Sequence, residues 1–187
     1  MTWLRLRHLP NVITIGRILL VGPTVWAILR QRFDLALVLF FIAGVSDGID
    51  GFLAKHFGWT SRLGSLLDPL ADKLLMVSSY AACAWTGLLP LWLAALVVGR
   101  DLLILTGATA YYLLLHPFEG QPSWVSKLNT LLQIVLLLAV LGQHGLVSLP
   151  VVLIQTLIYS VAATTIVSGL HYVIVWGGHL VRQLRGM

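Results

Sequence analysis

The chain has 187 residues, of which 58% are hydrophobic and only 10% are charged. This composition predicts an integral membrane protein and excludes a soluble domain with a single anchor. A lone cysteine, Cys83, excludes an intramolecular disulfide and a cysteine-based metal site. The net charge of +5 does not indicate nucleic-acid binding, because Lys and Arg gather at the ends of apolar segments, where they set topology and meet anionic lipid headgroups.

The predicted elements are almost entirely apolar helices. Residues 1–10 alternate Trp and Leu with Arg and His, which predicts a short interfacial helix lying on the membrane. Six apolar stretches follow, each long enough to cross a hydrocarbon core of about 30 Å. We expect them at 12–29, 34–54, 66–87, 89–115, 124–143 and 148–177. The predicted fold class is all-α, a polytopic membrane protein with six transmembrane helices. We expect 1–187 to form a single domain, because no repeat, low-complexity tract or linker interrupts it.

Basic residues predict the orientation of these spans, because cytoplasmic loops carry an excess of Lys and Arg. In a six-helix arrangement most of the flanking basic residues fall on one side. They are Arg5, Arg7, Lys55, Arg62, Lys127, Arg182 and Arg185. Arg30 and Arg32, in the first loop of the opposite side, are the exceptions. The balance predicts that both termini face the cytoplasm.

Four of the seven acidic residues of the chain are aspartates at positions 47, 50, 68 and 72. Asp47 and Asp50 are three residues apart and share a helix face, and Asp68 and Asp72, four apart, share a face of the next helix. An intramembrane carboxylate costs roughly 2.5–3.5 kcal/mol at a helix centre, so such a cluster is best explained by bound cations. With no histidine at ligand spacing, the oxygen donors favour Mg²⁺ or Mn²⁺ over zinc.

Small residues and one cation lie beside these aspartates. Gly51 follows Asp50 directly, and Ala54 and Gly64 are offset by about one helical turn from an aspartate. They leave a smooth surface where a bulky ligand can approach the backbone. Lys55 adds a positive charge suited to a phosphate oxygen. Together these features predict a nucleotide-diphosphate site with two metal ions on spans 34–54 and 66–87, for phosphoryl transfer.

This run of residues resembles the signature of the CDP-alcohol phosphotransferases. It reads Asp47-x2-Asp50-Gly51-x2-Ala54-Lys55-x8-Gly64-x3-Asp68-x3-Asp72. Every position matches in type and spacing except Lys55, where the family usually has Arg. Lysine keeps the charge but loses the bidentate fork of the guanidinium. The six-span layout is also similar, so the resemblance covers nearly the whole chain.

The resemblance implies a role for each residue. All four aspartates would ligate metal, with Asp68 and Asp72 at the catalytic centre and Asp72 also taking the proton of the acceptor hydroxyl. The cytidine pocket would be lined by Gly51, Ala54 and Gly64, with Lys55 on the diphosphate. The opening segment LPNVITIGRILLVGP is also similar, and places Asn11, Thr14 and Arg17 near the nucleotide phosphates. The family resemblance further implies a homodimer, and CDP-diacylglycerol as the donor whose reaction releases CMP.

Two acceptors remain open, phosphatidylglycerol, which would give cardiolipin, and glycerol 3-phosphate, which would give phosphatidylglycerol phosphate. Arg100 and Asp101 resemble the Arg-Asp pair of eukaryotic-type cardiolipin synthases, and Ser126-Lys127-Leu128-Asn129 is similar to the synthase form. A small dianion needs several cations for its recognition, so the few Lys and Arg in this part of the chain favour the lipid acceptor. We expect Arg100, Asp101, Lys127 and Lys73 to recognise the acceptor.

A transporter or cation channel is the competing class, because intramembrane aspartates gather there too. It predicts inverted repeats or broken helices in matching halves of the chain, and neither is visible. A transporter also has no need of Gly51, Ala54 and Gly64 at their present offsets. The sequence therefore favours a metal-dependent phosphatidyltransferase.

Overall fold

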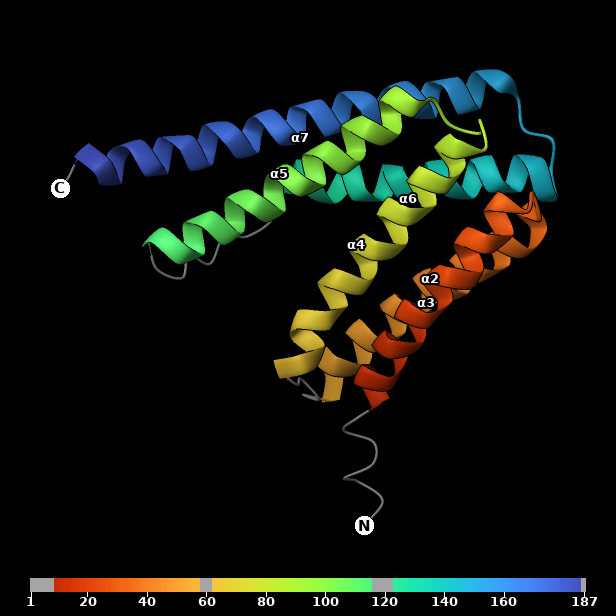
Figure 1. The fold of residues 1–187 in the computed structure, drawn as a ribbon, viewed down its shortest axis with the longest axis horizontal. Coiled ribbons are helices and arrows are strands. Elements are labelled where there is room, and N and C mark those ends of the chain that lie inside the picture. The colour runs from red at the N-terminus through yellow and green to blue at the C-terminus, as the bar shows by residue number, and fades with distance from the viewer. Residues whose placement is uncertain (1–8, 58–61, 116–122, 186–187) are drawn as a thin grey trace, which may run out of the picture. The chain divides into compact units, whose positions relative to one another are not determined.

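The computed structural model describes residues 9–57, 62–115 and 123–185, with the side chains of 13–48, 70–107 and 123–174. The described chain forms six α-helices (Figure 1). They are α2 (Leu9–Leu29), α3 (Phe33–Phe57), α4 (Arg62–Trp85), α5 (Leu91–Leu115), α6 (Trp124–Gly145) and α7 (Val151–Arg185). The predicted all-helical class is confirmed, and each helix overlaps one of the expected apolar stretches. The interfacial helix predicted at 1–10 lies almost wholly outside the described residues.

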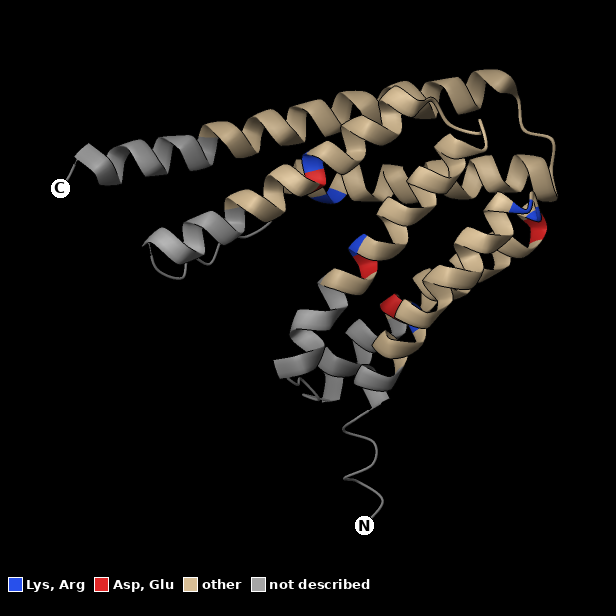
Figure 2. Ribbon diagram, viewed as in Figure 1, with Lys and Arg blue, Asp and Glu red and all other residues tan. Residues whose placement is uncertain are grey.

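Two of these helical segments are long and apolar enough to cross a membrane by length and composition. They are Trp124–Gly145 and Val151–Ile174, among the residues that the structure describes. Ile13–Leu29 is a further apolar helical segment, but it is shorter. Long stretches of the described helices carry no charged residue at all (Figure 2). These features support membrane association of the chain.

The chain divides into two compact units. The first comprises Met1–Leu91 and Leu137–Leu149, and the second comprises Trp92–Leu136 and Pro150–Met187. Helix α6 therefore contributes its C-terminal part to the first unit and its N-terminal part to the second. Within the first unit, α2 packs against both α3 and α4.

Small side chains allow the helices of the first unit to approach closely. Ala27 of α2, Ala36 and Ala43 of α3 and Ala71 of α4 are all fully buried. Lipid-embedded helices associate through van der Waals packing rather than through expulsion of water, so small residues are favoured where backbones meet. Phe40 is also buried, and it lies between the two alanines of α3 at helical spacing. One face of α3 is therefore its packing face.

Two helices of the first unit end in a similar hydrogen-bonded turn. After α2, the Arg32 N–H donates to the Ala27 carbonyl at 2.9 Å, and Gln31 adopts a φ of 57°. After α4, the Leu88 N–H donates to the Cys83 carbonyl at 2.9 Å, and Gly87 adopts a φ of 78°. This pattern satisfies carbonyl groups that the helix itself leaves unpaired. Gly87 suits the left-handed conformation because it has no Cβ, whereas Gln31 adopts it at a steric cost.

Candidate active site

On α3 and on α4, an aspartate lies one helical turn from a buried apolar residue. On α3, Asp47 follows buried Ala43 by one helical turn. On α4, Asp72 precedes buried Met76 by one turn, and buried Tyr80 continues the same face. Because α2 packs against both helices, Asp47 and Asp72 belong to one three-helix arrangement.

Asp47 and Asp72 have equal sequence offsets from the connection between α3 and α4. Asp47 stands ten residues before Phe57, the last residue of α3, and Asp72 stands ten residues after Arg62, the first of α4. At the rise of an α-helix, ten residues correspond to about 15 Å along each axis. Residues 58–61, which the structure does not describe, join the two helices. Equal offsets from so short a connection bring the carboxylate-bearing turns to similar levels.

Helix α2 contributes a buried cation to this level of the unit. The Arg17 guanidinium pairs with the Asp47 carboxylate, and its Nη1 lies 2.6 Å from Oδ1. The Arg17 side chain is 0% exposed, whereas the Asp47 side chain is 42% exposed. Thr14, one turn earlier on α2, is also fully buried. The structure therefore brings together two predicted site residues, Arg17 and Asp47, and it buries Thr14 one turn before Arg17 on α2.

Several predicted residues fall where only the backbone is described. Asp50 and Asp68 lie within α3 and α4, but their side chains are outside the described set, so the carboxylate quartet stays a prediction. Lys73, next to Asp72, has an exposed side chain. The predicted nucleotide-pocket residues likewise lie in helices whose side chains are not described there. They are Asn11, Gly51, Ala54, Lys55 and Gly64.

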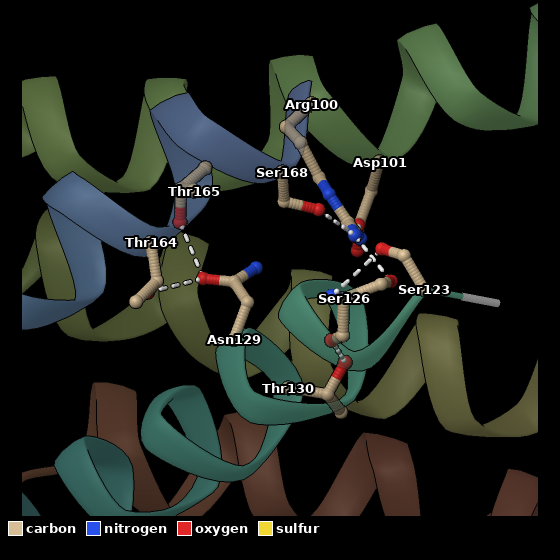
Figure 3. Close-up of polar contacts among 9 residues, drawn as sticks. All are labelled: Arg100, Asp101, Ser123, Ser126, Asn129, Thr130, Thr164, Thr165 and Ser168. Carbon is tan, nitrogen blue, oxygen red and sulfur yellow. Dashed lines mark hydrogen bonds and ion pairs between the residues drawn. The ribbon is translucent and has the colours of Figure 1, made fainter. Parts of the chain in front are cut away.

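The second unit contains a separate buried polar cluster around Arg100 (Figure 3). The Arg100 Nη1 donates to Asp101 Oδ1 at 2.8 Å, and both residues are 6% exposed. The Nη2 donates to the hydroxyls of Ser126 on α6 and Ser168 on α7, each at 2.6 Å. One guanidinium thus connects α5, α6 and α7.

Asn129 forms a second connection between α6 and α7 (Figure 3). Its Oδ1 accepts hydrogen bonds from the hydroxyls of Thr164 and Thr165, both at 2.9 Å. Asn129 is fully buried, and the two bonds orient its amide so that the oxygen faces α7. Lys127 is exposed, and its Nζ lies 5.1 Å from the centroid of the Trp124 ring. This cation–π contact leaves the ammonium at the surface of the unit.

Sequence reasoning missed the hydroxyls of α7 that complete this cluster. Thr164 and Ser168 are four residues apart and therefore share a helix face, with Thr165 adjacent. Hydroxyl groups on one face of an otherwise apolar helix commonly bond to a neighbouring helix. That spacing was the available signal, although it does not identify Arg100 and Asn129 as the partners.

The described carboxylates fit a site for divalent metal ions. Asp47 and Asp72 offer only oxygen donors, which are the ligands that Mg²⁺ and Mn²⁺ prefer. One oxygen of the Asp47 carboxylate pairs with Arg17, and the Asp47 side chain is 42% exposed. The donor chemistry therefore agrees with the predicted cofactor.

Comparison with known proteins gives the family. The model of the CDP-alcohol phosphatidyltransferase family matches residues 7–176. This match spans all six helices in whole or in large part, including the aspartates of α3 and α4. The chain belongs to the CDP-alcohol phosphatidyltransferase family.

Similar curated proteins carry two kinds of name. A probable cardiolipin synthase (CMP-forming) of Drosophila melanogaster is 34% identical over 181 residues, which cover 88% of this chain and 56% of that protein. The chloroplastic CDP-diacylglycerol–glycerol-3-phosphate 3-phosphatidyltransferase 1 of Oryza sativa subsp. japonica is 36% identical over 200 residues, covering 97% of this chain and 59% of that protein. A probable phosphatidylglycerophosphate synthase of Mycobacterium tuberculosis is 29% identical over 177 residues, covering 90% and 81%.

The aligned regions cover 56% and 59% of the first two of these relatives, so this chain corresponds to little more than half of each. Both relatives are therefore longer proteins with additional sequence. Family membership rests on the shared region.

Proposed function

We propose that this chain is an integral membrane phosphatidyltransferase. It transfers a phosphatidyl group from CDP-diacylglycerol to a glycerol-type alcohol and releases CMP. The proposal rests on the membership of the chain in this family, and it is supported by the equal sequence offsets of Asp47 and Asp72 from the α3–α4 connection, on two helices that pack on α2. The names of the similar proteins, which include a CMP-forming synthase and a CDP-diacylglycerol transferase, support the same donor.

The proposal includes six membrane spans with the active site facing the cytoplasm. Each of the six helices has at least 21 residues, enough to cross the hydrocarbon core. The distribution of Lys and Arg supports the cytoplasmic orientation of the loop between α3 and α4. A homodimer, implied by the family resemblance, also belongs to the proposal, and cross-linking of the protein in native membranes tests it.

The proposed mechanism assigns the acid–base step to Asp72. The acceptor hydroxyl oxygen forms a bond to the phosphorus that bears diacylglycerol, its proton passes to the Asp72 carboxylate, and the bond to CMP breaks with its electron pair remaining on CMP. A carboxylate of ordinary basicity accepts this proton most readily when it is already leaving in the transition state. Asp47, Asp50, Asp68 and Asp72 would hold Mg²⁺ or Mn²⁺. Bound divalent ions would neutralise the diphosphate and make CMP a better leaving group.

Phosphatidylglycerol is the acceptor that we favour. In the described part of the second unit, the polar groups buried around Arg100 are hydroxyls, an amide and a carboxylate. Asp101 offsets the charge of Arg100, so this cluster adds no net positive charge for the dianion of glycerol 3-phosphate. The assignment of Arg100, Asp101, Lys127 and Lys73 to acceptor recognition stays a prediction.

A reconstituted assay tests the reaction and the base together. The purified protein in lipid nanodiscs receives CDP-diacylglycerol, Mg²⁺ or Mn²⁺ and an acceptor, and released CMP is measured. We expect chelation of the metal to abolish release, and Asp72→Asn to lower the rate by about 10²–10⁴-fold. Asp34→Asn is the matched control, because Asp34 is an exposed aspartate in the first turn of α3. Wild-type rates in Asp72→Asn would remove Asp72 from the mechanism.

The acceptor is tested in the same nanodiscs by identifying the lipid product. Cardiolipin from added phosphatidylglycerol is the expected result, and turnover with glycerol 3-phosphate alone would reverse the assignment. Transport is the alternative to enzymatic activity. Cation flux through proteoliposomes without CMP release under any acceptor would overturn the proposed function.

A further inference from the structure

The most informative contact of the first unit joins a buried arginine to a half-exposed aspartate. Arg17 lies on α2 with its side chain 0% exposed, and its Nη1 is 2.6 Å from Oδ1 of Asp47 on α3. The Asp47 side chain is 42% exposed, so its carboxylate has a covered side and an open side. The arginine occupies the covered side.

This geometry leaves the outer part of the carboxylate free to bind a cation. A carboxylate has two oxygens and about four lone-pair sites, of which the Nη1 contact uses one. The attraction of a guanidinium whose Nη1 lies 2.6 Å from Oδ1 restricts the rotation of the carboxylate. Since Arg17 is enclosed by the packed helices, it contacts Asp47 from the covered side.

The same burial argues against direct contact between Arg17 and a bound diphosphate. A side chain with no exposed surface must first leave its packed position before a solvent-borne phosphate can reach it. Leaving would also break the ion pair with Asp47. Arg17 is therefore better placed to act on Asp47 than on a substrate.

We propose that Arg17 is a positioning residue that orients the metal ligand Asp47 from behind. The inference rests on the proposed function, because it takes Asp47 as a metal ligand. Partners that orient ligating carboxylates and histidines typically account for 10–100-fold in metal affinity. The ion pair links α2 to the metal site, so the packing of α2 against α3 contributes to the geometry of the ligand.

Arg17 has two opposing effects on the affinity of the site for a metal ion. The sign of the change in affinity on mutation therefore shows which effect is larger. A positive charge near the site repels a metal ion, so its removal alone strengthens metal binding. Orientation of the carboxylate favours the metal, so its loss weakens binding. Lysine retains the charge but lacks the planar fork of the guanidinium. Arg17→Gln removes both effects, whereas Arg17→Lys removes mainly the orientation.

The test measures Mn²⁺ affinity of the full chain in nanodiscs, without nucleotide, from the electron paramagnetic resonance signal of free Mn²⁺. We expect Arg17→Lys, which keeps the repulsion but loses the orientation, to weaken binding by about 10–100-fold. Arg17→Gln also relieves the repulsion, so we expect it to weaken binding by about 10-fold. Arg32→Gln, which removes an exposed arginine of the same unit, is the control and should match the wild type. Asp47→Asn should weaken binding, and adding Arg17→Gln to it should cause little further loss.

Other outcomes overturn the inference. Unchanged or tighter Mn²⁺ binding in a folded Arg17→Gln variant would show that orientation does not dominate. Unchanged Mn²⁺ binding with weaker CDP binding at saturating Mn²⁺ would place Arg17 on the diphosphate instead. If Arg17→Gln fails to fold, Arg17→Lys carries the same test, and wild-type affinity in it overturns the inference. A wild type that binds Mn²⁺ but releases no CMP would contradict only the proposed function. A wild type that binds no Mn²⁺ would contradict both the proposed function and the inference about Arg17.

Discussion

The buried ion pair of the second unit makes a quantitative prediction about stability. Arg100→Met removes the guanidinium that contacts Asp101, Ser126 and Ser168. The side chains of Arg100 and Asp101 are each 5% exposed, so water does not replace the lost partner. Breaking a buried pair by removing one member costs about 3–5 kcal/mol, because the remaining charge stays in a medium of low polarity.

The expected loss of stability in Arg100→Met comes from the charge that remains on Asp101. It is not a sum over the contacts that Arg100 makes. Each serine hydroxyl that loses Arg100 can still donate to a backbone carbonyl, so its loss adds little to the cost. The carboxylate of Asp101 keeps its charge when Arg100 is removed, and a buried charge that loses its cation is costly. A cost of this size is comparable with the whole stability of a small domain, about 5–15 kcal/mol, so we expect low yields of Arg100→Met.

A double-mutant cycle separates the charge from the packing. We expect Arg100→Met/Asp101→Leu to be less destabilised than Arg100→Met alone, because no charge is left unpaired. The free energy of unfolding is measured by circular dichroism during SDS titration of the protein in dodecylmaltoside micelles. Arg30→Met, which changes an exposed arginine, is the control and should stay within about 0.5 kcal/mol of the wild type. A cost below about 1 kcal/mol for Arg100→Met, or additive costs in the double variant, would refute the reasoning.

The same unfolding measurement tests two further groups of variants, one at the strained turns and one at the hydrogen bonds to Asn129. Gly87→Ala should destabilise the protein by about 1–2 kcal/mol, because Gly87 has a φ of 78° and its Cβ position is unobstructed, so backbone strain is the whole effect. Gln31→Gly should stabilise it by up to about 1 kcal/mol, because it relieves the same strain at a φ of 57°; opposite signs would contradict the account. Thr165→Val should cost about 1 kcal/mol through the lost bond to Asn129, and Thr164→Val should cost less. The Thr164 hydroxyl also lies 2.9 Å from the Ser160 carbonyl, so its proton is shared between that carbonyl and Asn129, and its bond to Asn129 contributes less. Equal costs for the two variants would refute this distinction.

The sequence by itself determined the features that depend on neighbouring positions along a helix. Long apolar stretches predicted the all-helical class, and the observed helices follow them. The pairing of Asp47 with Asp50, and of Asp68 with Asp72, follows from helical periodicity alone. The spacing of these aspartates and of the small residues between them also pointed to the family, which the comparison with known proteins confirmed.

The tertiary structure decided which distant side chains meet. Arg17 and Asp47 are thirty positions apart, and their pairing depends on how α2 packs against α3. Ser168 bonds to Arg100, and Thr165 bonds to Asn129, because α7 presents these hydroxyls to its neighbours. Helical periodicity identifies which residues share a face, but it contains no information about the partner helix. That choice is made by the packing of whole helices, through small buried side chains such as Ala27 and Ala43.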